Sequence, residues 1–254
     1  MEKNVEILPL KQGIIYGPVN SRRLGCSLGL NLSPDKYKLC SFNCIYCHFG
    51  WTKQLTNDIS KYRKDFPTKE NIFFAVRNAL QTIKNLDCVT FSGDGEPTLH
   101  PDFENIVNGV RELCDELLPE TPLAVLSNSS NLKNDSVIRA FSKIDLKILK
   151  LDAGIESIFI KINKPVHGIS LGSIIGDLKR QKDIIIQSIF VKGSVDNTQE
   201  ENLAAWIKAL AEIMPKKVQI YSTDRPVAEK QIEKVSKKDL EAIARRTIKE
   251  TGIP

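Results

Sequence analysis

Three cysteines lie within eight residues of the chain, in the order Cys-Ser-Phe-Asn-Cys-Ile-Tyr-Cys over residues 40–47. Three thiolates at this spacing can hold three corners of a [4Fe–4S] cube. The fourth iron is then left without a protein ligand, and an open iron is a site at which chemistry can take place. The motif therefore predicts an iron–sulfur cluster with Cys40, Cys44 and Cys47 as its ligands.

Two other uses of these cysteines compete with the cluster. A structural zinc site takes four ligands, usually as two spaced pairs. The chain has no second cysteine pair, and His48 directly follows Cys47, so the two side chains rarely point the same way. A disulfide framework is typical of small secreted domains rather than of a 254-residue chain without an export signal. Zinc remains the main alternative to the cluster.

The residues around the cysteines extend the pattern. Tyr46 places an aromatic side chain directly before the last cysteine, and the stretch 17–32 leads into the motif. Further on come Phe-Ser-Gly-Asp-Gly-Glu-Pro-Thr-Leu-His over residues 91–100, Leu-Asp-Ala-Gly over 151–154 and Asp-Arg-Pro over 224–226. From about residue 13 to about residue 230, the chain resembles the radical S-adenosylmethionine (SAM) oxidoreductases, in the branch related to the wyosine-base (tRNA imidazoguanosine) synthases.

The resemblance implies two cofactors, a [4Fe–4S] cluster and SAM. It implies reductive cleavage of SAM to a 5′-deoxyadenosyl radical that abstracts hydrogen from a substrate. It also implies an external one-electron donor of the flavodoxin or ferredoxin type, with RNA, and a tRNA base in particular, as a candidate substrate. Archaeal wyosine synthases carry further upstream cysteines for a second cluster. Only Cys26 lies upstream here, so we expect neither a second cluster nor wyosine synthesis itself.

Composition and length favour one domain over residues 1–254, with a lead-in and cluster loop at about 13–66 and a C-terminal helix at about 236–251. The start of the chain lacks an apolar targeting core, and no apolar run approaches the length of a membrane span, so we expect a cytoplasmic enzyme without a membrane partner. The net charge is +5 over residues 1–66, −4 over 67–215 and +4 over 216–254. Basic ends suit nucleic-acid partners, but they are more often simply solvated surfaces.

Apolar periodicity predicts strands that alternate with helices. Helices are expected at 68–83, 102–117, 135–141, 171–180, 200–213 and 236–249, and strands at 27–32, 88–92, 123–126, 146–151, 184–191 and 218–221. Six such units predict an α/β fold, an open (partial) parallel (β/α)6 barrel of the kind that the resemblance also implies. Cys88 and Cys114 are expected in its core, and a lone histidine such as His100 or His167 at the surface.

Functional side chains of parallel barrels gather at the carboxyl ends of the strands. Asp94, Glu96, Asn128, Asp152, Lys192 and Arg225 follow predicted strands, so we expect them to converge on the cluster. The resemblance assigns the SAM amino group to the segment Gly93, Asp94, Gly95 and Glu96, the SAM carboxylate or ribose to Asn128 and Asp152, and the adenine side to Tyr46. Gln187 is a further candidate if it faces the lumen.

The same residue types also have structural uses. A Gly-x-Gly-x segment suits any tight turn, Asn and Asp often cap helices, and Tyr46 suits simple packing. Arg22, Arg23 and Arg225 are candidate substrate contacts, because guanidinium groups match carboxylates and phosphates, or ion pairs that close the barrel edge. No catalytic acid or base is assigned. A zinc-stabilised nucleic-acid-binding module and an electron carrier that does not cleave SAM remain alternative functions.

Overall fold

A curved sheet of seven strands forms the centre of the molecule, in the computed structural model that describes residues 7–83 and 85–254. Its strand order is β1-β2-β5-β6-β7-β8-β10. β1 pairs with β2 in an antiparallel manner, and every later pair is parallel. The strands are β1 (Ile15–Ser21), β2 (Gly25–Leu30), β5 (Cys88–Phe91), β6 (Leu123–Ser127), β7 (Leu146–Lys150), β8 (Ile184–Ile189) and β10 (Lys217–Tyr221).

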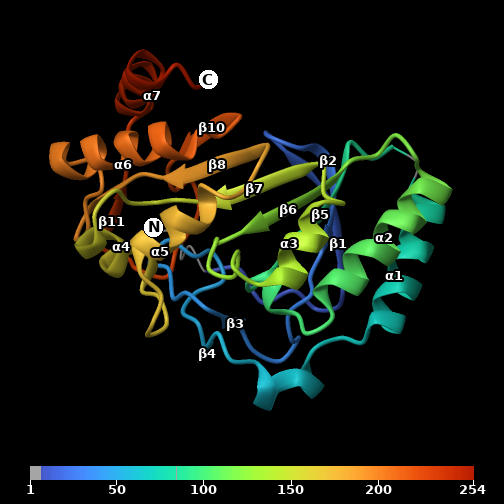
Figure 1. The fold of residues 1–254 in the computed structure, drawn as a ribbon. Coiled ribbons are helices and arrows are strands. Elements are labelled where there is room, and N and C mark those ends of the chain that lie inside the picture. The colour runs from blue at the N-terminus through green and yellow to red at the C-terminus, as the bar shows by residue number, and fades with distance from the viewer. Residues whose placement is uncertain (1–6, 84) are drawn as a thin grey trace, which may run out of the picture.

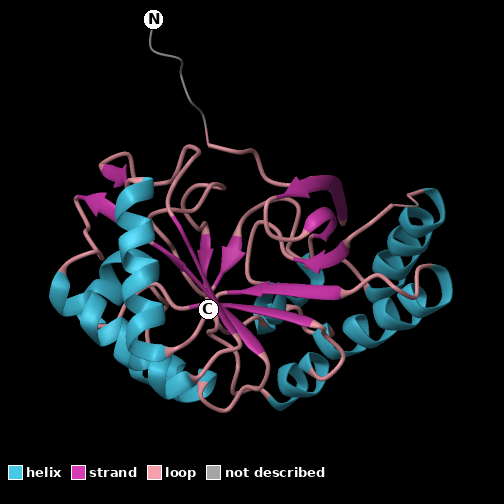
Figure 2. Cartoon of the chain, turned by 90° about the horizontal axis from the view of Figure 1, so that it is seen from above, coloured by secondary structure: helices cyan, strands magenta, loops and turns pink. Residues whose placement is uncertain are grey.

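Helices cover the outside of this sheet, as the view from above shows (Figure 2). α1 and α2 pack side by side, and α6 and α7 lie together near β10 (Figure 1). The helices are α1 (Lys69–Thr82), α2 (Phe103–Leu117), α3 (Asp135–Phe141), α4 (Glu156–Asn163), α5 (Leu171–Leu178), α6 (Glu200–Ile213) and α7 (Lys237–Thr251), with two 3-10 helices, η1 (Ser60–Asp65) and η2 (Pro97–Leu99).

Helix α1 shows how the sequence sets these elements. The Thr68 side chain accepts a hydrogen bond from the backbone amide of Asn71 and so satisfies one of the free donors at the helix start. Ile72, Val76 and Leu80 recur every four residues and are all buried against the sheet side of the helix. Capping and periodicity therefore agree, and the helix begins where the sequence predicts it.

The α/β fold with a mainly parallel sheet confirms the predicted class, and six of its strands and six of its helices match predicted elements. Strand β1, helix α4 and the 3-10 helices η1 and η2 were not predicted. Neither were the short strand pairs β3 (Leu39–Cys40) with β4 (Gln54–Leu55) and β9 (Val191–Gly193) with β11 (Ile232–Lys234). The predicted strand 184–191 is divided into β8 and β9 at Phe190.

The two edge strands of the sheet are joined by side chains. The Arg22 guanidinium, in the turn after β1, lies 2.9 Å from a carboxylate oxygen of Asp224, which follows β10. The Arg23 guanidinium lies 4.4 Å from the ring centre of Tyr221, at the end of β10. Arg22 thus makes an ion pair across the edges, the structural use that its sequence position also allowed. Within the described residues, no helix has both the length and the apolar character needed to cross a bilayer.

Candidate functional site

The cysteine loop is fixed by backbone hydrogen bonds to the end of helix α4. The Asn43 amide donates to the carbonyls of Asn163 and Lys164, each at 3.0 Å, and the Ile45 amide donates to the carbonyl of Ile162, also at 3.0 Å. Cys40 itself lies in the short strand β3, which pairs with β4. Because these bonds hold the backbone on both sides of Cys44, the loop has a defined shape before any ligand binds.

One pocket of about 240 Å³ collects the three cysteines and most of the predicted SAM residues. It receives side chains from the cysteine loop and from the carboxyl ends of five parallel strands, as expected for a parallel barrel. Residues that were predicted for the site and line this pocket are Cys40, Cys44, Tyr46, Cys47, Gly93, Asp94, Gly95, Glu96 and Asn128. Lys38, His48, Lys150 and Tyr221 also line it, and of these only His48 was considered from the sequence.

The cysteine sulfurs lie among amide donors in a buried setting. The Nδ2 atom of Asn128 lies 3.6 Å from the Cys40 sulfur, and the Nδ2 atom of Asn163 lies 3.6 Å from the Cys44 sulfur. Burial, and then the nearby Glu96 carboxylate, raise the pKa of Cys40 to about 11, while burial and the neighbouring Cys40 raise that of Cys44 to about 12. Cys40 and Cys44 are therefore neutral thiols at pH 7 in the metal-free loop, and metal binding to them must release protons.

The carboxylate of Glu96 is held entirely by the protein. Its oxygens accept hydrogen bonds from the Thr98 amide and hydroxyl at 3.1 and 2.7 Å, from the Ser127 hydroxyl at 2.8 Å and from the Asn128 amide at 2.7 Å. These bonds tie the segment after β5 to the segment after β6. Burial raises the pKa of Glu96, although the four donors oppose that shift. Glu96 therefore shapes the pocket wall by fixing Asn128.

Asp94 has spare bonding capacity in the pocket. Its side chain is buried, one oxygen accepts the backbone amide of Lys11, and the other has no hydrogen-bond partner among the described residues. Next to it, Gly95 passes so close to the cysteine loop that a Cβ atom would lie 2.0 Å from the carbonyl oxygen of Leu39. Asp94 lines the pocket, and a carboxylate oxygen without a partner is a ready acceptor for an ammonium group.

Asp94 gives a testable pH effect in the cluster-free protein. Burial raises its pKa to about 6. Because the unfolded carboxyl ionises near pH 4 and the folded one near pH 6, stability falls as the pH rises through that window. We expect Asp94→Asn to remove this pH dependence. Relative to the wild type, its free energy of unfolding should be about 1–2 kcal/mol higher above pH 6 and little changed below pH 4. Urea unfolding at pH 4, 5, 6 and 7 measures it, and identical pH profiles of the two proteins would contradict it.

A buried network lies behind Tyr46. The Asp152 carboxylate accepts hydrogen bonds from the Tyr46 hydroxyl, from Nδ2 of Asn163 at 2.8 Å and from the Ile189 amide at 3.0 Å. Nζ of Lys150 lies 2.8 Å from the same carboxylate and 3.0 Å from the Tyr221 hydroxyl. Burial lowers the pKa of Lys150, but Asp152 and then Tyr221 outweigh it and hold the pKa above its usual value. Asp152 thus anchors Tyr46 and a charged lysine.

Lys38 is the second lysine of the pocket. Its side chain is buried, and Nζ donates to the carbonyl oxygen of Gly50 at 2.7 Å. Within the described ranges 7–83 and 85–254, no carboxylate lies within ion-pair distance of it. This burial could not be predicted, because an isolated lysine two residues before a cysteine has no periodic context. A buried ammonium next to Cys40 favours negative charge in the pocket.

Other sequence-based expectations had mixed outcomes. Gln187 is buried but bonds Gln219 at 3.1 Å and is not among the residues that line the pocket. Lys192 pairs with Asp239 at 3.0 Å and does not join the pocket either. Arg225 is exposed, and so is His167.

Two further expectations concern core residues. His100 was expected at the surface, which is wrong: it is buried and bonds the Pro67 carbonyl at 2.9 Å and the Asp102 amide at 3.1 Å. It thereby closes the turn into α2. The predicted core positions of Cys88 and Cys114 are confirmed.

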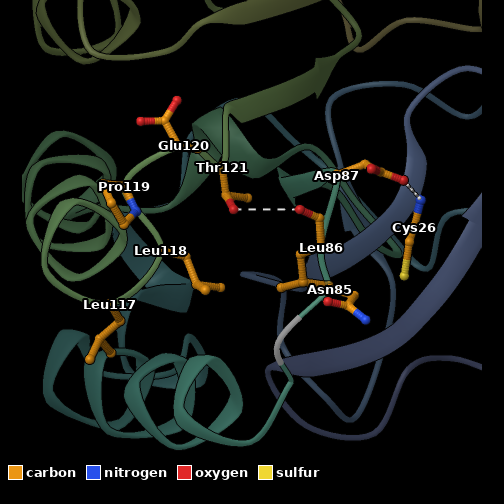
Figure 3. A pocket seen from close by; sticks show the side chains of 9 residues that line it. All are labelled: Cys26, Asn85, Leu86, Asp87, Leu117, Leu118, Pro119, Glu120 and Thr121. Atoms are coloured by element: carbon orange, nitrogen blue, oxygen red, sulfur yellow. Dashed lines mark hydrogen bonds between the residues drawn. The ribbon is translucent and has the colours of Figure 1, made fainter.

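A second cavity, of about 620 Å³, lies at the opposite end of the strands (Figure 3). It is formed by residues 85–87, just before β5, residues 117–121, before β6, and Cys26 of β2. The Asp87 carboxylate accepts the Cys26 amide at 2.7 Å, and the Thr121 hydroxyl donates to the Leu86 carbonyl (Figure 3). Although this cavity is larger, Cys26 is its one cysteine and the loop at 40–47 contributes nothing to it. Cys26 is therefore separate from the cysteine loop.

The sequence matches a known family over the cysteine loop and strands β5, β6 and β7. Residues 36–175 match the Radical SAM superfamily. The chain belongs to the radical SAM superfamily. This confirms the family expected from the cysteine motif and indicates an enzyme of the SAM-dependent radical type. The matched segment contains the cysteine loop, Asp94, Asn128 and Asp152.

Proteins with similar sequences include two whose names state no activity. A UPF0026 protein of Methanocaldococcus jannaschii is 33% identical over 225 residues, which are 86% of this chain and 66% of that protein. A UPF0026 protein of Helicobacter pylori is 30% identical over 84% of this chain and 67% of that protein. A protein of Brachyspira hyodysenteriae named GTPase Obg is 28% identical over 91% of this chain, and the chain spans 33% of its length. The chain thus spans a third to two thirds of these relatives.

Solved radical SAM structures share the fold at low identity. A structure of TYW1 with a lysine-pyruvate adduct bound has a TM-score of 0.56 at 14% identity and covers 88% of this chain and 73% of that one. SuiB of Streptococcus suis bound to S-adenosylmethionine has a TM-score of 0.61 at 16% identity, and the match covers 86% of this chain and 46% of SuiB. A radical SAM methyltransferase from Sphaerobacter thermophilus has a TM-score of 0.64 at 15% identity, and the match covers 90% of this chain and 65% of the methyltransferase.

Proposed function

We propose that the chain is a radical SAM enzyme that binds a [4Fe–4S] cluster through Cys40, Cys44 and Cys47 and cleaves SAM in the 240 Å³ pocket. The observation that carries this proposal is the convergence of the three cysteines with the free oxygen of Asp94 in that pocket. When bound, the reduced cluster and SAM supply the 5′-deoxyadenosyl radical that removes a hydrogen atom from the substrate.

The pocket residues fit such a cluster. Asn128 and Asn163 direct amide donors at two of the sulfurs, and hydrogen bonds to sulfur are among the features that tune protein-bound clusters. Lys38 offsets the negative charge of the thiolates. Within the described part of the chain, no three His, Cys, Asp or Glu side chains are grouped to hold a single metal ion. A cube does not require that grouping, because each cysteine binds a different iron.

The proposed SAM contacts follow from the free bonding groups of the pocket. The unpartnered oxygen of Asp94 accepts the SAM ammonium group, and Gly93 and Gly95 let the backbone approach it. Tyr46 presents its ring on the adenine side. Asp152 acts through Tyr46 and Lys150, because its oxygens already accept protein donors.

The substrate side of the proposal rests on the residues near Tyr221. Arg23 stacks on the Tyr221 ring, and Tyr221 lines the pocket. We propose Arg22, Arg23 and Arg225 as cationic contacts for an anionic substrate, with RNA as the candidate class. A cytoplasmic location and an external one-electron donor of the flavodoxin or ferredoxin type belong to the same proposal, because a reducing compartment keeps the cysteines free.

Metal and SAM binding test the proposed function. After anaerobic reconstitution with iron and sulfide, we expect about four iron atoms per chain. Equilibrium dialysis is expected to show SAM bound to the reconstituted protein and not to the metal-free chain. A chain that retains zinc in place of iron, or one that holds iron without binding SAM, would contradict the proposal. The first result favours the zinc-stabilised module and the second the electron carrier.

A further inference from the structure

Exposed apolar and basic side chains lie on helix α4, just after it, and on the segment that follows the cysteine loop. They are Trp51, Lys53, Ile160, Lys161 and Lys164, which we call the α4 patch. Trp51 is 43% exposed and Ile160 is 52% exposed, and Nζ of Lys164 lies 4.4 Å from the centre of the Trp51 ring. Among residues 7–83 and 85–254, no carboxylate is paired with any of its three lysines. The patch is therefore a positive surface with an aromatic anchor.

The α4 patch is distinct from the pocket mouth. None of its five residues is among those that line the 240 Å³ pocket. Lys161 and Ile160 lie in α4, and Lys164 follows directly after its last residue. Thr52, between Trp51 and Lys53, donates its amide to Oδ1 of Asn43 at 2.7 Å and its hydroxyl to the carbonyl of Phe42. Both segments of the patch are thus hydrogen-bonded to the cysteine loop.

Hydrogen bonds connect the residues of the patch and their neighbours to Cys44. The carbonyl of Lys164 accepts the amide of Asn43, the residue before Cys44, at 3.0 Å. Asn163, next to Lys164, donates from Nδ2 toward the Cys44 sulfur at 3.6 Å. Hydrogen bonds therefore connect the segment that carries Lys164 both to the backbone beside Cys44 and to the Cys44 sulfur.

We propose that the α4 patch is the docking surface for an acidic, one-electron-donating protein. This inference rests on the proposed function, since it needs a cluster on Cys44. One electron passes from the reduced donor to the oxidised cluster, the donor is oxidised by one electron, and no bond forms or breaks. Three unpaired lysines attract an acidic partner, and Trp51 supplies the desolvated centre that weak protein interfaces use. RNA would also suit lysines and an aromatic ring, but the hydrogen bonds that connect the patch to Cys44 favour an electron donor.

Charge reversal tests the docking surface. With reduced flavodoxin as the acidic donor, we expect the variant Lys53→Glu, Lys161→Glu, Lys164→Glu to lower the rate of cluster reduction at least tenfold at low ionic strength and to remove its salt dependence. Reduction by dithionite, and the 5′-deoxyadenosine that it supports, should stay unchanged. The matched control is Lys143→Glu, Lys182→Glu, Lys217→Glu, which changes three exposed lysines at the amino ends of the parallel strands. It should behave like the wild type.

The outcomes separate the two proposals. Wild-type rates in the patch variant, or an equal loss in the control variant, overturn the docking surface and leave the proposed function intact. A patch variant that loses affinity for RNA while flavodoxin reduces it normally assigns the patch to nucleic acid and also overturns the inference. A cluster that flavodoxin reduces through the patch but that never cleaves SAM supports the docking surface and contradicts the proposed function. A wild-type chain that assembles no cluster contradicts both.

Discussion

Replacing Cys44 by serine is expected to abolish cluster assembly while leaving the fold in place. Cys44 is the central ligand of the loop, and its neighbours are fixed by backbone bonds from Asn43 and Ile45 that do not involve the side chain. A serine hydroxyl has nearly the same size but is a poor ligand for iron in a site made for thiolates. After anaerobic reconstitution, the variant should lack the brown visible absorption and hold far less than the four irons of the wild type.

The chain offers a matched control for this substitution. Cys26 is a free, partly exposed cysteine in the cavity at the opposite end of the strands. Cys26→Ser should bind iron and sulfide like the wild type. Circular dichroism and thermal unfolding of both metal-free variants check that neither has lost the fold. A Cys44→Ser protein with a full cluster content, or a Cys26→Ser protein without one, would show that the cluster ligands have been assigned wrongly.

Asp152→Asn, in the buried network behind Tyr46, is expected to cause a larger loss of stability than the substitution of any polar residue that lines the pocket. The substitution keeps the size of the side chain and an acceptor oxygen, but it removes the negative charge beside the ammonium of Lys150. The Lys150 side chain is 14% exposed, so the solvent replaces little of the lost interaction. Breaking one side of a buried ion pair costs about 3–5 kcal/mol. Urea unfolding of the metal-free protein at pH 7 measures the change.

Replacing Lys150 as well should recover much of the stability that Asp152→Asn loses. In the double variant Lys150→Met, Asp152→Asn, neither charge of the pair is left, and methionine fills a similar volume to lysine. We expect the double variant to be about 2 kcal/mol more stable than Asp152→Asn alone. A cost below about 1 kcal/mol for Asp152→Asn would mean that the pair is solvated, and equal stability of the single and double variants would exclude charge as the cause.

Much of the parallel sheet and its helices follows from local sequence. Runs such as Ile184–Ile189 are β-branched and short, and helices such as α1 carry a cap and a regular apolar stripe, so pattern and structure agree. Helix α4 has only eight residues and carries isoleucine or phenylalanine on several faces, which hides its period. Strand β1 contains Gly17 and Pro18, which usually mark a turn and are tolerated here at a sheet edge.

Some residues of the candidate site could be predicted from the sequence, and others could not. The cysteines, the segment Gly93–Glu96 and Asn128 could be placed together because the carboxyl ends of parallel strands meet. The partners of Lys38 and Lys150 could not be predicted, since lysine is mostly a surface residue and burial depends on contacts far away in sequence. The spare oxygen of Asp94 and the full occupation of Glu96 also emerge only from the folded contacts.

The most direct test of the central claim is the detection of 5′-deoxyadenosine. The reconstituted protein is incubated anaerobically with SAM and dithionite, and the products are separated by chromatography. We predict 5′-deoxyadenosine and methionine in equal amounts from the wild type, and neither product from the variant in which Cys40, Cys44 and Cys47 are all replaced by alanine. Wild-type protein that carries a full, reducible cluster and binds SAM, yet forms no 5′-deoxyadenosine above the level of the alanine variant, would contradict the account.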